Sequence, residues 1–526
     1  MEMTLNEHSQ KTYRNLFFLV LTTATLFRLA IAGRFGFGAD EAHYVMYSRH
    51  LAWGYFDHPP MVAFLAALTN MVSKSLFFTR LGPIICSALS LIILRYLSLA
   101  LYRDERISFW AIVLLHLMPY QHLLMVALLP DSTLNVFWCS TLLAAWCAIR
   151  EGRWTEWILA GILFGGALLS KYHAILLPLC LFCYLTTSSR HRYWLGKIQP
   201  YVASLIGLIV FLPNIIWNAR HDWISYSFQL AHGGGTDFKI EKIFKVFGGQ
   251  LGVWSPIIFC LLIASFFYLF RQKPISDADR FVVWTSMPAF IFFCSIGIFG
   301  KILPHWTSVG WWTGSLVVVV VAFKKILKKG KAEIWWRRWS VAAAAIGFIM
   351  TVVLYTGLFV PIVSPVYSQA KTISIRLHQH FPAIKPLEPY KPMYDVSNGL
   401  FGWDQIAEKV EKIREKMPCP DKTLIFGHRF FTISKLAVYL NHDTVATILH
   451  RKNNQYRLWF SAGDHFGWDA LFIDEGRHLK DPARYRPLFG KVDPEPEIIK
   501  VYRKGSLAHE IRVYKYYDFK GKYEEK

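Results

Sequence analysis

The chain has 526 residues, of which 54% are hydrophobic, 16% aromatic and only 18% charged. This composition excludes an ordinary soluble globular protein, because several windows of roughly 18 or more residues are nearly free of charge, as in membrane-spanning helices. The formal net charge is +22, but Lys and Arg gather at the ends of apolar segments, so we assign them to membrane topology and anionic lipid headgroups rather than to nucleic acid.

Apolar segments recur along the first two thirds of the chain and predict a polytopic α-helical membrane protein with about 11–13 transmembrane helices. The first segment has no small-residue cleavage site after it, so we expect a retained helix rather than a signal peptide. The predicted spans are 15–33, 78–101, 107–125, 132–149, 157–169, 173–187, 200–217, 253–270, 281–299, 307–323 and 340–361.

Basic residues lie in every second loop, from Lys11 and Arg14 to the stretch "KKILKKGKAEIWWRRW" that begins at Lys324. The positive-inside rule places these loops and the N-terminus in the cytoplasm. The other loops, and everything after about residue 361, are then expected on the outer side of the membrane.

The first outer loop, residues 34–77, begins with the motif "GADEAHYVMYSRHLAWG". Apolar residues spaced three to five apart predict an amphipathic helix that lies at the membrane interface. Asp40 is a candidate general base, and Glu41 a second catalytic carboxylate that orients it or a neighbour. Alternatively, Asp40 caps this helix and Glu41 stabilises its dipole.

The same loop contains "GYFDHPPM", in which Pro59 and Pro60 predict the start of a helix over "MVAFLAALTN". Asp57 and His58 therefore precede a helix N-terminus, where anions are favoured. His58 is a candidate donor phosphate contact, and Asp57 a candidate ligand of a divalent metal. The alternative is a capped turn without a catalytic role.

Further ionisable residues fall at the outer ends of later spans, where charge is costly and therefore indicates function. Asp131, in "LLPDSTLNVFW", is a candidate catalytic acid or a helix cap. Lys171, Arg220 and Lys301 are candidate donor phosphate-binding cations, although Lys171 alternatively snorkels towards water. His305, in "KILPHWTSVGWW", is a candidate metal ligand or phosphate contact, or else an ordinary turn histidine.

The polar tail predicts a small α/β domain over residues 386–526, after a transmembrane domain over 1–361 and a linker over 362–385. Helical periodicity covers 403–417. Strand-like runs follow as "KTLIFGH", "TVATIL", "DALFID", "EIIKVYRK" and "EIRVYKYY", and "VYRKGSLAHEIRVY" predicts a terminal hairpin.

Acids and bases that converge at the outer face of a membrane require a substrate that is available there, and few nucleotides are. A lipid-phosphate-linked sugar fits, because its tail stays in the bilayer while its phosphate meets cations and its sugar meets carboxylates. An inverting transfer needs a base for a hydroxyl acceptor and charge stabilisation of the leaving lipid phosphate.

Several segments, taken in order, resemble bacterial members of the GT-C class of integral-membrane glycosyltransferases. The resemblance covers about the first 360 residues and is strongest to the branch related to the protein O-mannosyltransferases and to the aminoarabinose transferase that modifies lipid A. The segments are "ADEAHYVMYSRHLAWGYFDHPPMVAFLAALT", "TRLGPIICSALS", "LLPDSTLNVFW", "LLSKYHAILLP" and "KILPHWTSVGWW".

The resemblance implies an outward-facing cavity, an undecaprenyl-phosphate-linked sugar donor and catalytic acids at Asp40 and Asp131. In the lipid A branch, an acid–Lys–Pro–Pro segment supplies a metal ligand and a phosphate-binding lysine. Asp57 matches the acid, but His58 replaces the lysine, so its phosphate contact would weaken at high pH, where imidazole is neutral. His305 lies where the family supplies another cavity residue.

We therefore expect an inverting hexosyl- or pentosyltransferase at the periplasmic face of the bacterial inner membrane, with no certain cofactor beyond a candidate divalent metal. Its expected partners are the undecaprenyl-phosphate-linked donor, lipid A, lipopolysaccharide or another envelope acceptor, and membrane lipids. The alternative is a transporter or flippase of lipid-linked sugars, which would favour mid-span charges and broken helices in two repeated halves; the sequence has neither. A scaffold protein would not need converging polar loops.

Overall fold

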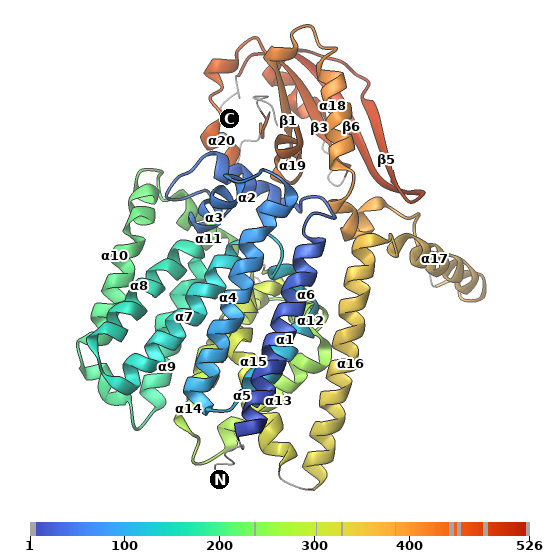
Figure 1. The fold of residues 1–526 in the computed structure, drawn as a ribbon. Helices are drawn as coiled ribbons and strands as arrows, with labels where there is room; N and C mark the ends of the chain where they lie inside the picture. Colours follow the sequence, from blue (N-terminus) through green and yellow to red (C-terminus); the bar gives the residue numbers. More distant parts are fainter. Residues whose placement is uncertain are drawn as a thin grey trace. The chain divides into compact units, whose positions relative to one another are not determined.

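The computed structural model in Figure 1 describes residues 7–235, 238–300, 302–327, 330–383, 385–440, 446–449, 454–476 and 482–521. Its contacts divide the chain into two compact units. Unit 1 contains the residues up to Ala32 together with Leu51–Val352, and unit 2 contains Gly33–His50 together with the residues from Val353 onward. The limits at 361 and 386 that the sequence suggested for the domains stay a prediction.

Unit 1 is a bundle of α-helices, and each span predicted from the sequence overlaps one or two of them. The last helix, α16, begins in unit 1 and ends in unit 2. The helices are α1 (Glu7–Ile31), α3 (Met61–Asn70), α4 (Leu76–Tyr102), α5 (Glu105–His116), α6 (Pro119–Leu124), α7 (Pro130–Glu151), α8 (Trp154–Ser170), α9 (Leu176–Thr187), α10 (Gln199–Ala219), α11 (Ile224–Gly233), α12 (Ile240–Trp254), α13 (Pro256–Arg271), α14 (Asp277–Phe299), α15 (Ser308–Ile326) and α16 (Lys331–Phe359), with 3₁₀ turns η1 (Tyr172–Ile175), η2 (Arg192–Gly196) and η3 (Pro304–Thr307).

Within the described residues, 7 helices are long and apolar enough to cross a membrane, or up to 8 if the bent pair α12–α13 counts as one span. Several predicted spans are shorter apolar helices instead, such as α8. Proline explains two breaks, because it donates no backbone hydrogen bond and restricts the residue before it. Pro119 separates α6 from α5, and Pro256 follows the 110° bend after α12.

Glycine allows a close helix contact in the bundle, between α8 and α10. A Cβ atom at Gly161 would lie 2.4 Å from the carbonyl oxygen of Ala203, and one at Gly165 would lie 2.4 Å from the side chain of Val210. Small residues at such contacts let helix backbones approach, which is a common way to pack helices in a membrane. Helix α8 is therefore held as part of the bundle although it is short.

Unit 2 is an α/β domain around a six-stranded sheet, as the sequence predicted for the tail. Its helices are α2 (Ala39–Arg49), α17 (Val363–His380), α18 (Trp403–Arg414), α19 (Phe430–Leu440) and α20 (Gln455–Trp459). Its strands are β1 (Thr423–Gly427), β2 (Ala446–Thr447), β3 (Asp469–Asp474), β4 (Phe489–Val492), β5 (Glu497–Arg503) and β6 (Ser506–Phe519).

The sheet has the order β2-β1-β3-β6-β4, and β5 also pairs with β6. Strand β1 is parallel to β2 and β3, whereas β6 is antiparallel to its neighbours. All five residues of β1 are buried, as expected for a parallel strand covered on both faces. Lys504 and Gly505, both with positive φ, form the tight turn of the predicted β5–β6 hairpin.

Helix α2 differs from the half-exposed interfacial helix that the sequence suggested. Every residue from Glu41 to Tyr47 is buried, and α2 packs against α19. The guanidinium of Arg49 donates to the carbonyl oxygen of Ala437 in α19 over 2.9 Å. The apolar residues of α2 thus belong in part to the core of unit 2.

Candidate active site

The central feature of unit 1 is a buried ion pair between Asp131 and Lys171. Asp131 lies in the first turn of α7, and Lys171 is the residue after α8, in extended conformation. Lys171 Nζ donates to Asp131 Oδ2 over 2.7 Å, and the two side chains are only 6% and 3% exposed. The alternatives of a snorkelling lysine and of a simple capping aspartate are therefore wrong.

A third segment completes this pair. Ser308, the first residue of α15, donates from Oγ to Asp131 Oδ1 over 3.1 Å. Farther along the same two helices, Trp312 Nε1 donates to Asn135 Oδ1 over 2.8 Å, which fixes α15 against α7. Both oxygens of the Asp131 carboxylate are therefore held by groups that come from other segments.

Two histidines lie close enough to this ion pair to interact with its charges. His173 belongs to η1, and its ring contacts Phe293 at a centroid distance of 4.5 Å. His305 belongs to η3 and stacks on Tyr120 at 5.0 Å, with 14° between the ring planes. The loops at the ends of α8 and α14 thus bring imidazoles and a cation together, as the sequence predicted.

The Asp57–His58 segment is positioned by backbone hydrogen bonds. Tyr55 N donates to His58 O over 3.0 Å, which closes a turn before α3 begins at Met61, as predicted. The same segment is held by α11, because Gln229 Nε2 donates to Asp57 O over 2.6 Å. The side chains of Asp57 and His58 point towards each other, with 4.0 Å between Oδ2 and Nε2.

His58 also interacts electrostatically with Lys171 and Asp131, so the segment belongs to the same cluster. Burial lowers the pKa of the His58 imidazole below its ordinary value, while the Asp57 carboxylate opposes this and Lys171 reinforces it. His58 is therefore a neutral hydrogen-bonding group near pH 7 in the free protein. We call Asp131, Lys171, His173, His305, His58 and Ser308 the bundle cluster.

Asp40 and Glu41 belong to unit 2, where they have different surroundings. Glu41 is 3% exposed, and its Oε2 accepts from Gly38 N over 2.8 Å, so it caps helix α2. Asp40 is exposed in the first turn of the same helix. The capping role that the sequence allowed for Asp40 is thus filled by Glu41, and the catalytic roles of both remain predictions.

The remaining predicted phosphate-binding residues are Arg220 and Lys301. Arg220 is exposed at the C-terminal end of α10, and Lys301 lies outside the described residues. No group of three or more His, Cys, Asp or Glu side chains in the described part of the chain is arranged to hold a metal ion. The metal-binding roles of Asp57 and His305 therefore rest on the sequence pattern alone and stay predictions.

Sequence reasoning missed the partners that fix the bundle cluster. It gave no role to Ser308 or Tyr120 and did not pair Asp131 with Lys171. Ser308 follows His305 within the motif "PHWTS", so its position near the cluster could have been inferred from the motif. Tyr120, in α6, had no comparable signal, because it lies in no motif that carries a predicted site residue.

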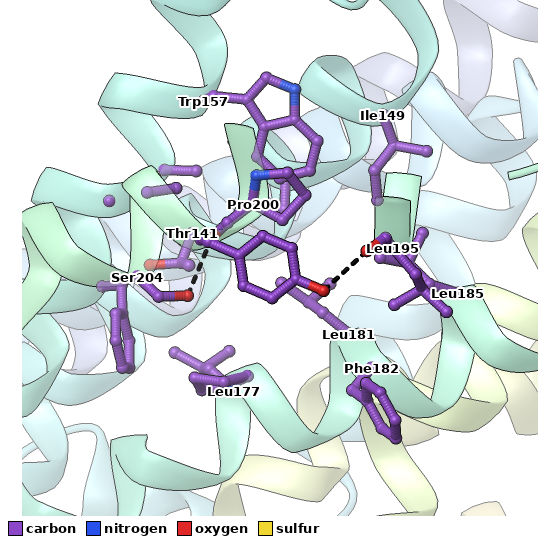
Figure 2. Close-up of a pocket in the computed structure, with 17 residues that line it drawn as sticks. Thr141, Ile149, Trp157, Leu177, Leu181, Phe182, Leu185, Leu195, Pro200 and Ser204 are labelled. Carbon is purple, nitrogen blue, oxygen red and sulfur yellow. Dashed lines mark hydrogen bonds between the residues drawn. The ribbon is translucent and has the colours of Figure 1, made fainter. Parts of the chain in front are cut away.

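A separate cavity of about 230 Å³ lies among α7, α8, α9 and α10, between side chains such as Trp157, Leu181 and Phe182 (Figure 2). Two of its polar side chains bond to backbone: Tyr201 OH donates to Leu195 O over 2.7 Å, and Ser204 Oγ donates to Pro200 O over 2.9 Å. The lining is otherwise apolar and contains no residue of the bundle cluster. We therefore assign the chemistry to the bundle cluster and not to this cavity.

The fold and the cluster define a multi-pass membrane protein with the GT-C fold and a C-terminal α/β domain. The family model described as "Dolichyl-phosphate-mannose-protein mannosyltransferase" matches residues 57–217. This match covers Asp57, His58, Asp131 and Lys171.

The chain is similar in sequence to one curated protein and in fold to solved structures. The lipid A galacturonosyltransferase RgtD of Rhizobium johnstonii is 25% identical over 297 residues, which are 55% of this chain and 61% of that protein. ArnT from Cupriavidus metallidurans has the same fold, with a TM-score of 0.59 and 14% identity over 96% of this chain and 98% of that one. A second structure of that ArnT, bound to undecaprenyl phosphate, aligns with a TM-score of 0.57, 15% identity and coverage of 94% and 97%.

A more distant structure shares the same architecture. The archaeal oligosaccharyltransferase AglB from Archaeoglobus fulgidus, in complex with an inhibitory peptide and a dolichol-phosphate, aligns with a TM-score of 0.51 and 10% identity over 94% of this chain and 74% of that one. The chain is therefore similar to ArnT in fold, and the resemblance to GT-C glycosyltransferases that the sequence indicated is confirmed.

Proposed function

We propose that the protein is a glycosyltransferase that moves a sugar from undecaprenyl phosphate to lipid A or a related envelope acceptor. The observation that carries the proposal is the bundle cluster, in which a buried lysine and several imidazoles converge from distant segments. The partial family match includes four of the proposed site residues, and the relatives named above act on lipid A or bind a polyprenyl phosphate.

In this proposal the donor phosphate contacts Lys171, His58 and His305. The ammonium of Lys171 has three N–H groups, one of which donates to Asp131. Asp131 therefore orients the lysine, while the other two N–H groups can meet phosphate oxygens. Cations at this position stabilise the negative charge that develops on the departing lipid phosphate.

The side chain of His173 is a further argument that the bundle cluster binds a ligand. Its Nδ1 atom is buried and has no hydrogen-bond partner among the described residues. Buried polar atoms normally have a partner, so an atom without one is expected to face water or a bound group. Together with the ion pair, this gives the cluster hydrogen-bonding capacity that the protein itself does not use.

Asp40 acts as the base in the proposed reaction. It removes the proton from the acceptor hydroxyl, whose oxygen forms a bond to the anomeric carbon of the sugar while the bond to the lipid phosphate breaks. The configuration at the anomeric carbon is thereby inverted. The reaction takes place at the periplasmic face, with the N-terminus in the cytoplasm, because the basic loops alternate along the chain.

The test is mass spectrometry of lipid A from cells that contain or lack the protein. The proposal predicts the loss of one sugar from lipid A when the protein is absent, and restoration by the native chain but not by the Lys171→Met variant. Unchanged lipid A and unchanged surface glycans in the strain that lacks the protein would overturn the proposal.

A further inference from the structure

Helix α17 (Val363–His380) lies in a basic stretch of unit 2 that the sequence suggested was a linker. No Asp or Glu occurs between Glu333 and Glu388, whereas Lys371, Arg376 and Lys385 do. Figure 1 shows α17 as a separate rod that turns away from the end of α16. The helix has 18 residues, of which only Ser374 is buried.

One face of α17 is fixed to its own unit by specific contacts. Ser374 Oγ accepts from Leu387 N over 2.9 Å, and Tyr367 OH donates to Glu388 O over 3.1 Å. The ring of Tyr367 also packs against Tyr394 at 5.3 Å. These contacts set the rotation of the helix about its axis, and therefore which side chains point outward.

The outward side carries an apolar stripe. Val366, Ile373 and Leu377 are 64%, 56% and 41% exposed, and Phe381, just past the end of the helix, is 60% exposed. Val366, Ala370, Ile373 and Leu377 recur at intervals of four, three and four residues, so they lie along one line of the helix. The exposed Arg376 lies beside this stripe on the polar side.

The start of α17 is close to the end of a predicted membrane span. From Trp339 to Phe359, α16 carries no charged residue, and this length corresponds to roughly 31 Å, the thickness of a bilayer core. Three residues, which reach ~10 Å at most, separate Phe359 from Val363. Arg503 fixes the end of α16 by donating to Leu358 O over 2.6 Å.

We propose that α17 is a membrane-surface helix that binds an anionic lipid bilayer. The apolar stripe lies among the outer parts of the acyl chains, and Arg376 and Lys385 contact the phosphates of the headgroups. The occupant is a bilayer rather than a second copy of the chain, because the helix begins within reach of the membrane boundary and carries only positive charge. The proposal does not depend on the transfer activity.

The experiment uses the full chain in nanodiscs that contain either phosphatidylcholine alone or phosphatidylcholine with one fifth phosphatidylglycerol. The photoreactive residue p-benzoylphenylalanine replaces Ile373 in one variant and Thr372 in a matched control, since Thr372 is exposed on the polar side. After illumination, mass spectrometry counts lipid adducts on the helix. We expect at least tenfold more adduct at position 373 than at 372.

A second comparison tests the charge. Arg376→Glu is expected to lower the adduct at position 373 at least threefold in the anionic nanodiscs and to leave it unchanged in the neutral ones, whereas the exposed Lys416→Glu should change neither. Equal lipid adducts at 372 and 373, no lipid adduct at 373, or a crosslink from 373 to a second protein chain would each overturn the proposal.

Discussion

Two buried lysines, one in each unit, have different partners. In unit 2, Lys435 Nζ donates to the backbone carbonyl oxygen of Gly399 over 2.8 Å. The buried Arg503 of the same unit also donates to backbone, at two carbonyl groups near the end of α16. In unit 1, Lys171 meets the side chain of Asp131, and this carboxylate also accepts from Ser308. The first pattern positions chain segments, whereas the second gathers chemical groups from distant segments.

We infer from this difference that the two lysines have different roles. A hydrogen bond to an unpaired carbonyl group at a helix end stabilises the fold directly. A buried ion pair, by contrast, is often no more stabilising than apolar residues of the same volume. The bundle would therefore lose little if both members of the Asp131–Lys171 pair were replaced together, and we infer that the pair serves binding and catalysis.

The largest effect is expected at Asp40, the exposed acid in the first turn of α2. Asp40→Asn should lower the transfer rate by about 10²–10⁴-fold, the usual contribution of a general base, with unchanged thermal stability. The measurement is transfer from undecaprenyl-phosphate-linked sugar to lipid A by purified protein. Full activity of the variant would remove Asp40 from the mechanism.

The neighbouring residue is the matched control. Glu41→Gln weakens the hydrogen bond to Gly38 N and should cost ~1 kcal/mol of stability, which is measured as a lower midpoint of thermal unfolding. If Glu41→Gln instead lowered activity as much as Asp40→Asn without a change in stability, the two roles would have to be exchanged.

The next effect concerns the ion pair. Lys171→Met should lower transfer by about 10²-fold or more and should destabilise the protein by ~3–5 kcal/mol, because the Asp131 carboxylate is left buried without its partner. The double variant Asp131→Asn with Lys171→Met should regain most of the stability and none of the activity. Both quantities are measured on the same purified samples.

Lys435 is a control for the effect of replacing a buried lysine that has no proposed role in the reaction. It is 4% exposed, like Lys171, but bonds to backbone in unit 2. Lys435→Met should therefore reduce stability while the activity per folded molecule is retained. Transfer activity in the Asp131→Asn, Lys171→Met double variant would contradict the proposed division between the two units.

A smaller effect is expected at Arg503, which supports the end of α16. Arg503→Met removes its bonds to two carbonyl groups and should cost ~1.5–3 kcal/mol, measured as a shift of the unfolding midpoint. The transfer activity per folded molecule should be the same in this variant as in the native chain. A loss of activity at full stability would mean that unit 2 contributes to the reaction through this contact.

The smallest effect is a pH dependence at His58. Burial lowers its pKa, so the unfolded chain binds the proton more readily than the folded one. The contribution of His58 to the free energy of unfolding is therefore fully present above about pH 6.5. It is lost as the pH falls below that value. His58→Gln should flatten this decline between pH 7 and 5, whereas the exposed His380→Gln should not. Identical curves for the native chain and His58→Gln would contradict the lowered pKa of His58.

Much of the fold could be predicted from the sequence, because long apolar runs and short β-branched runs have few alternatives. "DALFID" forms β3 with the predicted bounds. Helix α19, over "FFTISKLAVYL", was not predicted, although Ile433, Leu436, Ala437 and Leu440 recur at helical spacing. Helix α17 was missed because Pro365 and several Ser and Thr residues reduce its helix propensity.

The candidate site was predicted in part, because charged residues at the ends of apolar spans are unusual. Asp131 and Lys171 were both identified, but their pairing depends on how α7 and α8 pack, which local sequence does not encode. The helix cap could not be predicted from the sequence either, because Asp40 and Glu41 are adjacent. The structure shows that Glu41 caps the helix, since it accepts from Gly38 N.

The most direct test of the bundle cluster is the binding of undecaprenyl phosphate to the full chain in nanodiscs, measured by native mass spectrometry. The account predicts that the Asp131→Asn, Lys171→Met double variant, folded and stable, binds at least tenfold more weakly than the native chain, a difference of about 1.4 kcal/mol. Equal binding by the two proteins would contradict the claim that this ion pair holds the donor phosphate.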